Sequence, residues 1–475
     1  MQQKFIIIGM DDNREPYFPP EALTHIRRGK VFSGGVRHKE IVQGLLPEGA
    51  EWISITVPLG NVFRQYERVF AEQNKEQEKE QEKEQNKEKE KGGEDSLTIK
   101  EDGRDNEAII VFASGDPLFF GFANTVKRKL PQAEIKLYPT FNSLQTLAHR
   151  LVMPYDDMRT VSLTGRPWQE LDRALIERAP KIGILTDREH TPATIAARLL
   201  EYGYTYYIMY IGEHLGNPEK ERIRRMTLQE AAEGEFEHPN CLLLHADNAL
   251  LTIAGGPSLP SREVRPYYRG QSVLTTTVGS SLPSRSVAGI MSCRPFGIPD
   301  EQFAHLPGRP GMITKAPIRL LTLQALELNR RRVLWDIGFC TGSVSIEARL
   351  HFPHLTVVAF EIRPEGEELM RINARRFGAP GITAITGDFL LTDIGHLPRP
   401  DAVFIGGHGG HLPDVLARIK EVLLPGGCIV FNSVSAESKA AFTQGGEAAG
   451  LTLHPSTRIA LNDYNPIEIM KATLS

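Results

Sequence analysis

The chain has 475 residues, of which 41% are hydrophobic and 24% are charged, and its formal net charge is −4 at pH 7. This length predicts two or three domains, and the composition is typical of a globular protein. The acidic balance disfavours a nucleic-acid partner. The four cysteines are scattered without a C-x-x-C pair, which indicates neither a disulfide framework nor a structural zinc site. No apolar run reaches the roughly 20 residues that cross a bilayer, so we expect a cytoplasmic protein with no membrane partner.

Short apolar runs alternate with amphipathic segments over residues 1–250, which predicts an α/β domain. Strands are expected at residues 4–9, 30–35, 51–57, 108–113, 134–139, 160–165, 181–187, 206–213 and 241–246. Helices are expected at residues 20–29, from 63 onward, and at 118–129, 171–178 and 191–203.

Two stretches lack a buried pattern. Residues 72–91 are only Glu, Lys, Gln and Asn, so this part of a predicted insertion at 72–107 cannot bury a core. It forms either a solvated helical spur supported by Glu–Lys pairs or a disordered segment, and a partner-binding role is the less favoured interpretation. Residues 251–310 are rich in Ser, Pro, Gly and Thr, which predicts a linker between domains.

The periodicity returns in the last third and predicts a second α/β domain at residues 311–475. Strands are expected at residues 333–335, 357–360, 382–385, 402–405, 428–434, 451–456 and 467–472. Helices are expected at residues 313–328, 343–350, 365–377 and 413–423, with one more between the strand ending at 434 and the strand beginning at 451.

The first strand of this domain runs into a glycine-bearing turn, Gly338 to Gly342, and then into a helix. Such a turn presents backbone N–H groups to a ligand, although the glycines can also serve only to make a tight turn. Glu361 ends the next strand, at the spacing of an acid that bonds ribose hydroxyls. A dinucleotide fingerprint would need glycine at the positions of Cys340 and Ser343, so that interpretation is weak.

Four features in this order resemble a Rossmann-like, seven-stranded methyltransferase that uses S-adenosylmethionine (SAM). They are the D-I-G-F-C-T-G turn at 336–342, Glu361, Gly387-Asp388, and the Pro-Gly-Gly turn at 425–427. The resemblance implies that the glycine turn holds the methionine part, Glu361 the ribose, and Asp388 with Phe389 the adenine. Cys340 stands where the family usually has glycine, so its side chain either crowds the cofactor or points away. The implied SAM contacts are Thr314, Gly338, Phe339, Cys340, Thr341, Gly342, Glu361, Asp388 and Phe389.

A glycine-rich loop follows the fourth strand of this domain. His408 and His411 have the H-x-x-H spacing of metal ligands, but no third ligand is evident, so we expect no metal site. The backbone of the loop is better interpreted as the lining of a substrate pocket, with His408 as a candidate acid or base. The lining glycines are Gly406, Gly407, Gly409 and Gly410.

The N-terminal half carries a second distinctive stretch, V-F-A-S-G-D-P-L-F-F-G at residues 111–121. With PTFNSLQTLAHRL, VSLTGRP, LTDREHTPATIA and IGEHLGNPEKERI, it resembles the tetrapyrrole methylases, a SAM-dependent family with two α/β lobes, and most closely their precorrin-7 C-5 branch. Physically, Asp116 need do no more than cap the following helix. The family usually has G-x-G-P-G after its first strand, whereas this chain has G-M-D-D-N at residues 9–13. The implied SAM contacts are Ser114, Gly115, Asp116, Pro117, Thr140 and Ser143.

Taken together, the two halves resemble a bifunctional family of cobalamin synthesis that methylates a precorrin at C-5 and C-15 and removes CO₂ from its C-12 acetate. That resemblance implies SAM as cofactor, a precorrin or cobalt-precorrin as substrate, and a homo-oligomer. The substrate's carboxylates need cationic anchors, for which Lys315, Arg319, Arg166 and Arg188 are candidates, each with solvated surface as the alternative.

Two other interpretations stay open. In one, the SAM fold acts on another substrate such as RNA, which the acidic charge disfavours. In the other, one half is a degenerate binding module; the features that support this are Cys340 and the D-D-N loop.

Overall fold

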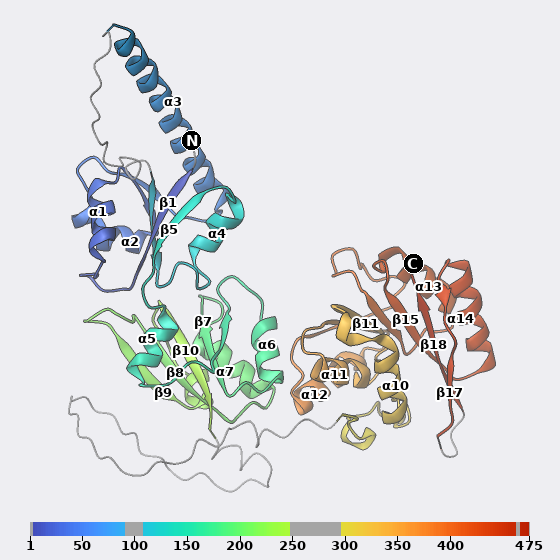
Figure 1. Cartoon of the computed structure of the whole chain (residues 1–475). Coiled ribbons are helices and arrows are strands. Elements are labelled where there is room, and N and C mark those ends of the chain that lie inside the picture. Colours follow the sequence, from blue (N-terminus) through green and yellow to red (C-terminus); the bar gives the residue numbers. More distant parts are fainter. Residues whose placement is uncertain (1–2, 91–107, 248–295, 462–465, 475) are drawn as a thin grey trace.

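The computed structural model describes residues 3–90, 108–247, 296–461 and 466–474, and these form three sheets with helices around them (Figure 1). Two five-stranded sheets, which we call the first and second lobes, lie in residues 4–246. The third sheet, in the C-terminal unit, lies in residues 333–473. No helix among the described residues is long and apolar enough to cross a membrane.

The first lobe is a parallel sheet in the order β3-β2-β4-β1-β5. The interior strand β1 is a nearly continuous apolar run because helices cover both faces of a parallel sheet. The strands are β1 (Lys4–Met10), β2 (Val31–Gly34), β3 (Glu51–Ser54), β4 (Ile109–Ser114) and β5 (Glu134–Tyr138). The helices are α1 (Pro20–Arg28), α2 (Val36–Val42), η1 (Gln43–Leu45), α3 (Gly60–Glu90) and α4 (Phe122–Lys129).

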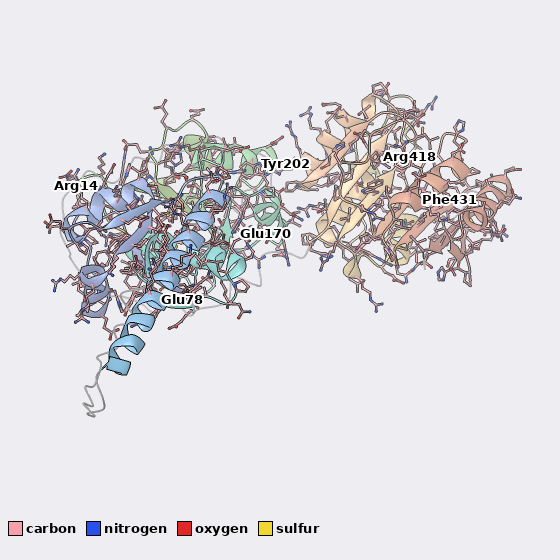
Figure 2. All side chains as sticks on the ribbon, turned by 90° about the horizontal axis from the view of Figure 1, so that it is seen from above. Arg14, Glu78, Glu170, Tyr202, Arg418 and Phe431 are labelled. Atoms are coloured by element: carbon pink, nitrogen blue, oxygen red, sulfur yellow. The ribbon has the colours of Figure 1, made fainter. Side chains whose placement is uncertain are left out.

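Helix α3 begins on the core of the first lobe and then leaves it. Val62 and Tyr66 are fully buried against the sheet, whereas Arg68 pairs with Glu72 in solvent at 2.8 Å. Figure 2 shows Glu78 on the part of the helix that projects away from the lobes. Of the two alternatives for the Glu/Lys/Gln stretch, the structure therefore has the helical spur as far as Glu90, and residues 91–107 lie outside the described chain.

The second lobe is a mixed sheet in the order β6-β7-β10-β8-β9, in which only β6 and β7 are parallel. The sequence did not predict β9, α8 or, in the first lobe, α2. The expected helix at 118–129 begins only at Phe122, because the Asp116 carboxylate accepts a hydrogen bond from Leu118 N and makes a turn there. The strands are β6 (Arg159–Ser162), β7 (Lys181–Leu185), β8 (Tyr207–Glu213), β9 (Arg222–Met226) and β10 (Asn240–Ala246). The helices are α5 (Ser143–Arg150), α6 (Gln169–Ile176), α7 (Pro192–Glu201) and α8 (Leu228–Ala232).

The C-terminal sheet has the order β13-β12-β11-β14-β15-β18-β16, and β17 also pairs with β18. Strands β11 to β15 are parallel and β18 is antiparallel, which confirms the expected seven-stranded Rossmann-like path and adds β17. The strands are β11 (Val333–Ile337), β12 (Thr356–Glu361), β13 (Ile382–Thr386), β14 (Ala402–Ile405), β15 (Cys428–Ser433), β16 (Thr452–Leu453), β17 (Thr457–Ile459) and β18 (Ile467–Thr473). The helices are η4 (Asp300–Gln302), α10 (Ala316–Leu326), η5 (Leu328–Arg330), α11 (Ser343–His351), α12 (Glu365–Phe377), α13 (Leu412–Val422) and α14 (Ala436–Ala448).

A buried ion pair fixes the segment that enters this unit. Arg319 on α10 and Glu347 on α11 are both fully buried, with Nε and Oε2 2.6 Å apart. Glu347 also accepts from the backbone N–H groups of Gly297 and Ile298, and Arg319 donates to the carbonyl of Thr314 at 2.7 Å. Residues 296–314 are thereby held against the C-terminal sheet, whereas residues 251–295 of the predicted linker lie outside the described chain.

The second lobe touches the C-terminal unit through α6, α7 and the residues that follow α7. Tyr204 Oη donates to the carbonyl of Gly378, just past α12, at 2.8 Å, and the contact is buried. Glu201 pairs with Arg375, and Ile176 packs into the apolar cluster behind α12. Figure 2 shows Glu170 and Tyr202 on the side of the second lobe that faces the C-terminal unit.

We expect Arg319→Met to destabilise the protein strongly. Removing one member of a buried pair leaves the other charge buried without compensation, at a cost of about 3–5 kcal/mol. The midpoint of denaturant unfolding, followed by circular dichroism, measures the loss. Arg371→Met is the matched control, because Arg371 and Glu368 form an exposed pair. A change for Arg319→Met no larger than that of the control would contradict the importance of the buried pair.

Candidate functional site

A cavity of about 530 Å³ lies between the first and second lobes. Its lining comes from the ends of β1 and β4, the start of α2 and α5, and the ends of β7 and β8. Among the predicted SAM contacts, Ser114, Gly115 and Ser143 line it, whereas Asp116, Pro117 and Thr140 do not. The cavity thus lies at the carboxyl edge of the parallel sheet, where open α/β sheets bind ligands.

Backbone packed against backbone shapes the floor of this cavity. A Cβ on Gly9 would lie 2.1 Å from the Gly115 carbonyl oxygen and 2.9 Å from the Thr140 nitrogen. Gly115 has φ +62°, and a Cβ there would lie 2.8 Å from Asn142 Cα. Only glycine fits both positions, so the end of β1, the Ser114–Gly115 turn and the loop before α5 pack closely. Thr140 therefore supports the cavity from behind.

The second cavity, of about 480 Å³, lies at the carboxyl edge of the C-terminal sheet. The predicted residues that line it are Thr314, Lys315, Gly338, Phe339, Cys340, Glu361, Asp388, Phe389, Gly406, Gly407, His408 and Gly409. Those that do not line it are Arg319, Thr341, Gly342 and Gly410. Most of the residues predicted for this site are therefore brought together around one cavity.

The glycine turn after β11 is left-handed at three positions. Gly338, Cys340 and Gly342 have φ values of +78°, +52° and +74°. A Cβ on Gly338 would lie 2.5 Å from Gly407 N, so the turn and the glycine-rich loop after β14 touch through their backbones. A Cβ on Gly342 would lie 2.5 Å from the Met370 sulfur on α12. These glycines are required by close packing as well as by backbone conformation.

Cys340 is the residue of this turn that differs from the expected glycine. Its thiol donates to the carbonyl of Met312 at 3.2 Å, in the segment held by the Arg319–Glu347 pair. Burial, with the Glu361 carboxylate as the next cause, raises the pKa of the Cys340 thiol. A raised pKa keeps the sulfur protonated at neutral pH, which argues against a nucleophilic role. The positive φ explains why glycine suits this position.

Glu361 is buried at the end of β12 and braces the turn. Its Oε2 accepts from Cys340 N at 2.8 Å, and its Oε1 accepts from the backbone and the guanidinium of Arg363 at 3.1 and 2.9 Å. A carboxylate oxygen has two acceptor positions, so Oε1 is fully engaged and Oε2 keeps one position for a further donor such as a ribose hydroxyl. Arg363, which the sequence did not indicate, also lines the cavity.

Asp336 lies at the base of the same cavity and is fully buried. Its Oδ2 accepts from Ser345 Oγ at 2.5 Å, and its Oδ1 has no hydrogen-bond partner among the described residues. Burial raises the pKa of this carboxyl from 3.8 to about 7, although the hydrogen bonds from Ser345 oppose the shift. The sequence shows Asp336 as the first residue of the D-I-G-F-C-T-G turn without a role of its own, because burial of both its oxygens depends on the packed sheet.

The two residues predicted to flank the adenine are partly engaged by the protein. Asp388 Oδ1 accepts from Leu390 N at 2.9 Å and so makes the turn after β13. Phe389 is buried and meets Phe360 and Trp335 edge-on, with ring centroids 5.1 and 6.2 Å apart. Both residues still line the cavity, so Asp388 keeps one carboxylate oxygen for a ligand and Phe389 provides an apolar wall.

His408 lies on the cavity wall beside Phe431, with 5.7 Å between the ring centroids. Its Nδ1 accepts from Gly410 N at 3.2 Å, which leaves the hydrogen of the neutral ring on Nε2. Burial, followed by the charge of His411, lowers the pKa of His408. A neutral His408 is thus the form at pH 7. In the described chain no three His, Cys, Asp or Glu residues are grouped as metal ligands.

The four predicted substrate anchors differ in whether they line a cavity. Arg319 is a correction: its guanidinium is fully buried and bound by Glu347, Asp300 and backbone carbonyls, so it positions Thr314 instead of meeting a substrate. Lys315 lines the C-terminal cavity, with Nζ 3.8 Å from Asp300. Arg166 and Arg188 are exposed and do not line the N-terminal cavity, although Arg166 stacks on Phe120, which does.

Comparison with known proteins matches both halves of the chain. Residues 4–232 match the family of tetrapyrrole (corrin/porphyrin) methylases, and residues 306–473 match the precorrin methyltransferase domain. A precorrin-6Y C(5,15)-methyltransferase (decarboxylating) of a Sinorhizobium species is 31% identical over 71% of each chain. A cobalt-precorrin-6B C(15)-methyltransferase (decarboxylating) of Salmonella typhimurium is 41% identical over 29% of this chain and 70% of its own. A precorrin-6Y C5,15-methyltransferase structure from Geobacter metallireducens is 32% identical and covers 38% of this chain and 98% of its own, with a TM-score of 0.35.

The parallel sheets, the glycine turns at their carboxyl edges and the family matches define a methyltransferase with two α/β halves. The chain belongs to the family of the precorrin-6Y C(5,15)-methyltransferases (decarboxylating).

We expect Asp336 to make stability depend on pH. Its folded-state pKa of about 7 lies above the ordinary 3.8, so the folded protein binds the extra proton between these values. The free energy of unfolding should therefore fall as pH rises from about 4 to about 7 and level off above that. Urea unfolding of the wild type and of Asp336→Asn across this range measures the difference, and parallel profiles would contradict the buried carboxyl as its source.

We expect Cys340→Gly to stabilise the protein by about 1 kcal/mol, because a left-handed backbone strains any residue with a Cβ. Cys340→Ala is the matched control, since it removes the thiol and keeps the Cβ. Thermal unfolding should rank the glycine variant above the alanine variant. If the glycine variant is no more stable than the alanine variant, the left-handed backbone at this position does not strain a residue with a Cβ.

Proposed function

We propose that this chain transfers methyl groups from SAM to C-5 and C-15 of a precorrin-6B-type tetrapyrrole and removes CO₂ from its C-12 acetate, which gives precorrin-8 in cobalamin biosynthesis. The C-5 step belongs to the cavity between the lobes, and the C-15 and decarboxylation steps belong to the C-terminal cavity. The observation that carries the proposal is the presence of two separate glycine-shaped cavities, one in each region that matches a methyltransferase family.

The residues of the C-terminal cavity fit SAM as cofactor. The backbone of Gly338 to Cys340 lines the cavity and would hold the methionine part, Oε2 of Glu361 keeps one acceptor position for the ribose, and Asp388 with Phe389 offers a polar and an apolar contact to the adenine. Thr314 lies opposite this turn, in the segment fixed by Arg319. In the N-terminal cavity, Ser114, Gly115 and Ser143 form the corresponding wall.

SAM, when bound, supplies an electrophilic methyl group on a sulfonium. The meso carbons of a reduced tetrapyrrole are electron-rich, so the protein's main contribution is to align the carbon with the methyl group. Apolar walls such as Phe389 and Phe404 solvate the sulfonium charge weakly, which favours a step in which that charge disappears. These walls also exclude water from the reacting atoms.

The C-15 step prepares the decarboxylation. Attack by C-15 leaves an iminium-like electron sink in the ring, and the electron pair of the breaking C–CO₂ bond of the neighbouring acetate moves into it. The protein then has to orient the acetate and manage one proton. His408 on the wall of the glycine-rich loop is our candidate for that proton transfer, and Lys315 is our candidate anchor for a substrate carboxylate. The backbone of Gly406 to Gly409 provides a surface on which a flat macrocycle can lie closely.

Several features of the proposal rest on the sequence and the family together. We assign residues 1–250 to the C-5 half and 311–475 to the C-15 half, with 251–310 as the connection. The homo-oligomer and the cytoplasmic location stay predictions.

We expect purified protein to consume two SAM per tetrapyrrole and to release CO₂, and each half can be switched off separately. Gly115→Ala should abolish the C-5 methyl, because its Cβ would meet Asn142 Cα at 2.8 Å. Gly338→Ala should abolish the C-15 methyl and CO₂ release, because its Cβ would meet Gly407 N at 2.5 Å. Mass spectrometry of the product distinguishes the two steps.

Gly44→Ala is the control, since a Cβ there meets nothing within 4 Å. The assay is run with metal-free and with cobalt-loaded precorrin-6B, so that it also identifies the preferred form. Methyl transfer without CO₂ release by the wild type would remove the decarboxylase assignment, and no transfer to either substrate would refute the proposed function.

A further inference from the structure

The loop after β1 is the feature that the family resemblance leaves without a role. Where the resemblance leads one to expect G-x-G-P-G, the chain carries Asp11 and Asp12. Asp12 is only 8% exposed and lines the N-terminal cavity. A buried carboxylate requires partners, since its desolvation is costly. Asp12 has them on both sides of the cleft: Arg37 Nε lies 3.3 Å from Oδ1, and His214 Nδ1 lies 3.5 Å from Oδ2.

Arg37 is held in a defined direction by these contacts. Its Nε faces Asp12, and its Nη2 donates to Ser114 Oγ at 3.0 Å. No described residue accepts a hydrogen bond from Nη1. Arg37 also lines the cavity, and no other lysine or arginine does so in the described chain. The one permanent cation of this cavity is thus oriented by the protein and keeps donors for a ligand.

Ser114 is oriented by a second donor. The backbone N–H of Gly35 donates to His38 Nδ1 at 3.3 Å, so the hydrogen of the neutral ring is on Nε2. His38 Nε2 lies 3.0 Å from Ser114 Oγ and therefore donates to it. Burial, followed by the charge of Arg37, lowers the pKa of His38 to about 4, which keeps this arrangement at neutral pH.

These two contacts determine where the hydroxyl hydrogen of Ser114 can point. A hydroxyl has two acceptor positions and one donor. Arg37 and His38 occupy both acceptor positions of Ser114 Oγ, so its own hydrogen must point to a different acceptor. No described residue provides one, and Ser114 is exposed on the cavity wall. A guanidinium and a hydroxyl donor side by side match an anionic acceptor with two oxygens.

We propose that Arg37 and Ser114 form a carboxylate-binding subsite in the N-terminal cavity, and that Asp12 and His38 are positioning residues that aim them. The inference rests on the proposed function, because it takes SAM and a tetrapyrrole as the occupants of this cavity. Both carry carboxylates: SAM on its methionine part, and the tetrapyrrole on its acetate and propionate side chains. The D-D-N loop then holds Arg37 in place through Asp12, where the family resemblance would lead one to expect a glycine loop.

The test is the C-5 methylation kinetics of the full chain, with SAM and precorrin-6B varied separately. Loss of a charged hydrogen bond weakens binding by about 10- to 100-fold, so Arg37→Ala should raise one KM by that factor. A rise in the KM of SAM assigns the subsite to the cofactor's carboxylate, and a rise in the KM of precorrin-6B assigns it to a substrate side chain. Ser114→Ala should raise the same KM by a smaller factor, and Arg37→Lys should recover part of the loss.

Arg14→Ala is the matched control. Arg14 lies on the same loop, but it pairs with Glu219 at 3.3 Å in solvent and does not line the cavity. The C-15 step serves as an internal control in every variant. Asp12→Asn should raise the KM that Arg37→Ala raises, with little change in kcat, as a residue that only aims the anchor would.

Equal KM values for Arg37→Ala and Arg14→Ala would overturn the subsite. If Arg37→Ala does not fold, Ser114→Ala and Arg37→Lys carry the same comparison. A wild type without C-5 methylation would refute the proposed function instead. The subsite is then judged by calorimetric titration of SAM and, separately, of precorrin-6B into Gly338→Ala and Gly338→Ala/Arg37→Ala, and equal affinities of the two variants for both ligands would overturn it.

Discussion

The C-terminal cavity depends on one buried ion pair. Arg319 and Glu347 lie on different helices, and between them they bind the backbone of Gly297, Ile298 and Thr314. The entering segment therefore forms one wall of the site, because Met312 to Lys315 line the cavity and Met312 contacts the glycine turn through the Cys340 thiol. Two charges without water need full hydrogen bonding, and here backbone groups supply it. The sequence predicted Arg319 as a substrate anchor, but the side chain is buried and instead fixes the segment that carries Thr314.

Close backbone packing shapes both cavities, although they belong to different sheets. In both, a glycine at the carboxyl end of a parallel strand packs so closely against a neighbouring backbone that a Cβ would not fit. Gly9 packs against Gly115 in one cavity, and Gly338 packs against Gly407 in the other. Close backbone packing removes side chains from the floor and leaves peptide groups facing the ligand. The difference lies in the walls: the N-terminal cavity is closed by a second lobe, and the C-terminal cavity by a segment of its own unit.

Local pattern predicted the elements whose residues alternate or repeat cleanly. Helix α12 and strand β14 have the predicted bounds, since each has an uninterrupted apolar signal. Strand β9 was missed because R-I-R-R-M is charged and half-exposed, and it exists only through its pairing with β8. The same limit applies to the sites. The glycine turn and Glu361 are near in sequence and were predicted together. Ser114 was predicted as well, but its contact with Arg37, and that of Arg37 with Asp12, join three distant segments. A sequence pattern carries no information on such a meeting.

Helix α12 is anchored near its middle and just past its C-terminal end. Near its middle, Asn373 donates to the carbonyl of Thr341 in the glycine turn at 2.9 Å, and just past its last residue Gly378 accepts the Tyr204 hydroxyl of the second lobe. Gly378 is therefore buried where the second lobe contacts the C-terminal unit and does not face solvent. Amino-acid changes in the second half of α12 and just beyond it must satisfy two partners, the glycine turn on one side and a different lobe on the other. The contact between the two halves thus restricts which residues fit at Gly378, a position that lines neither cavity.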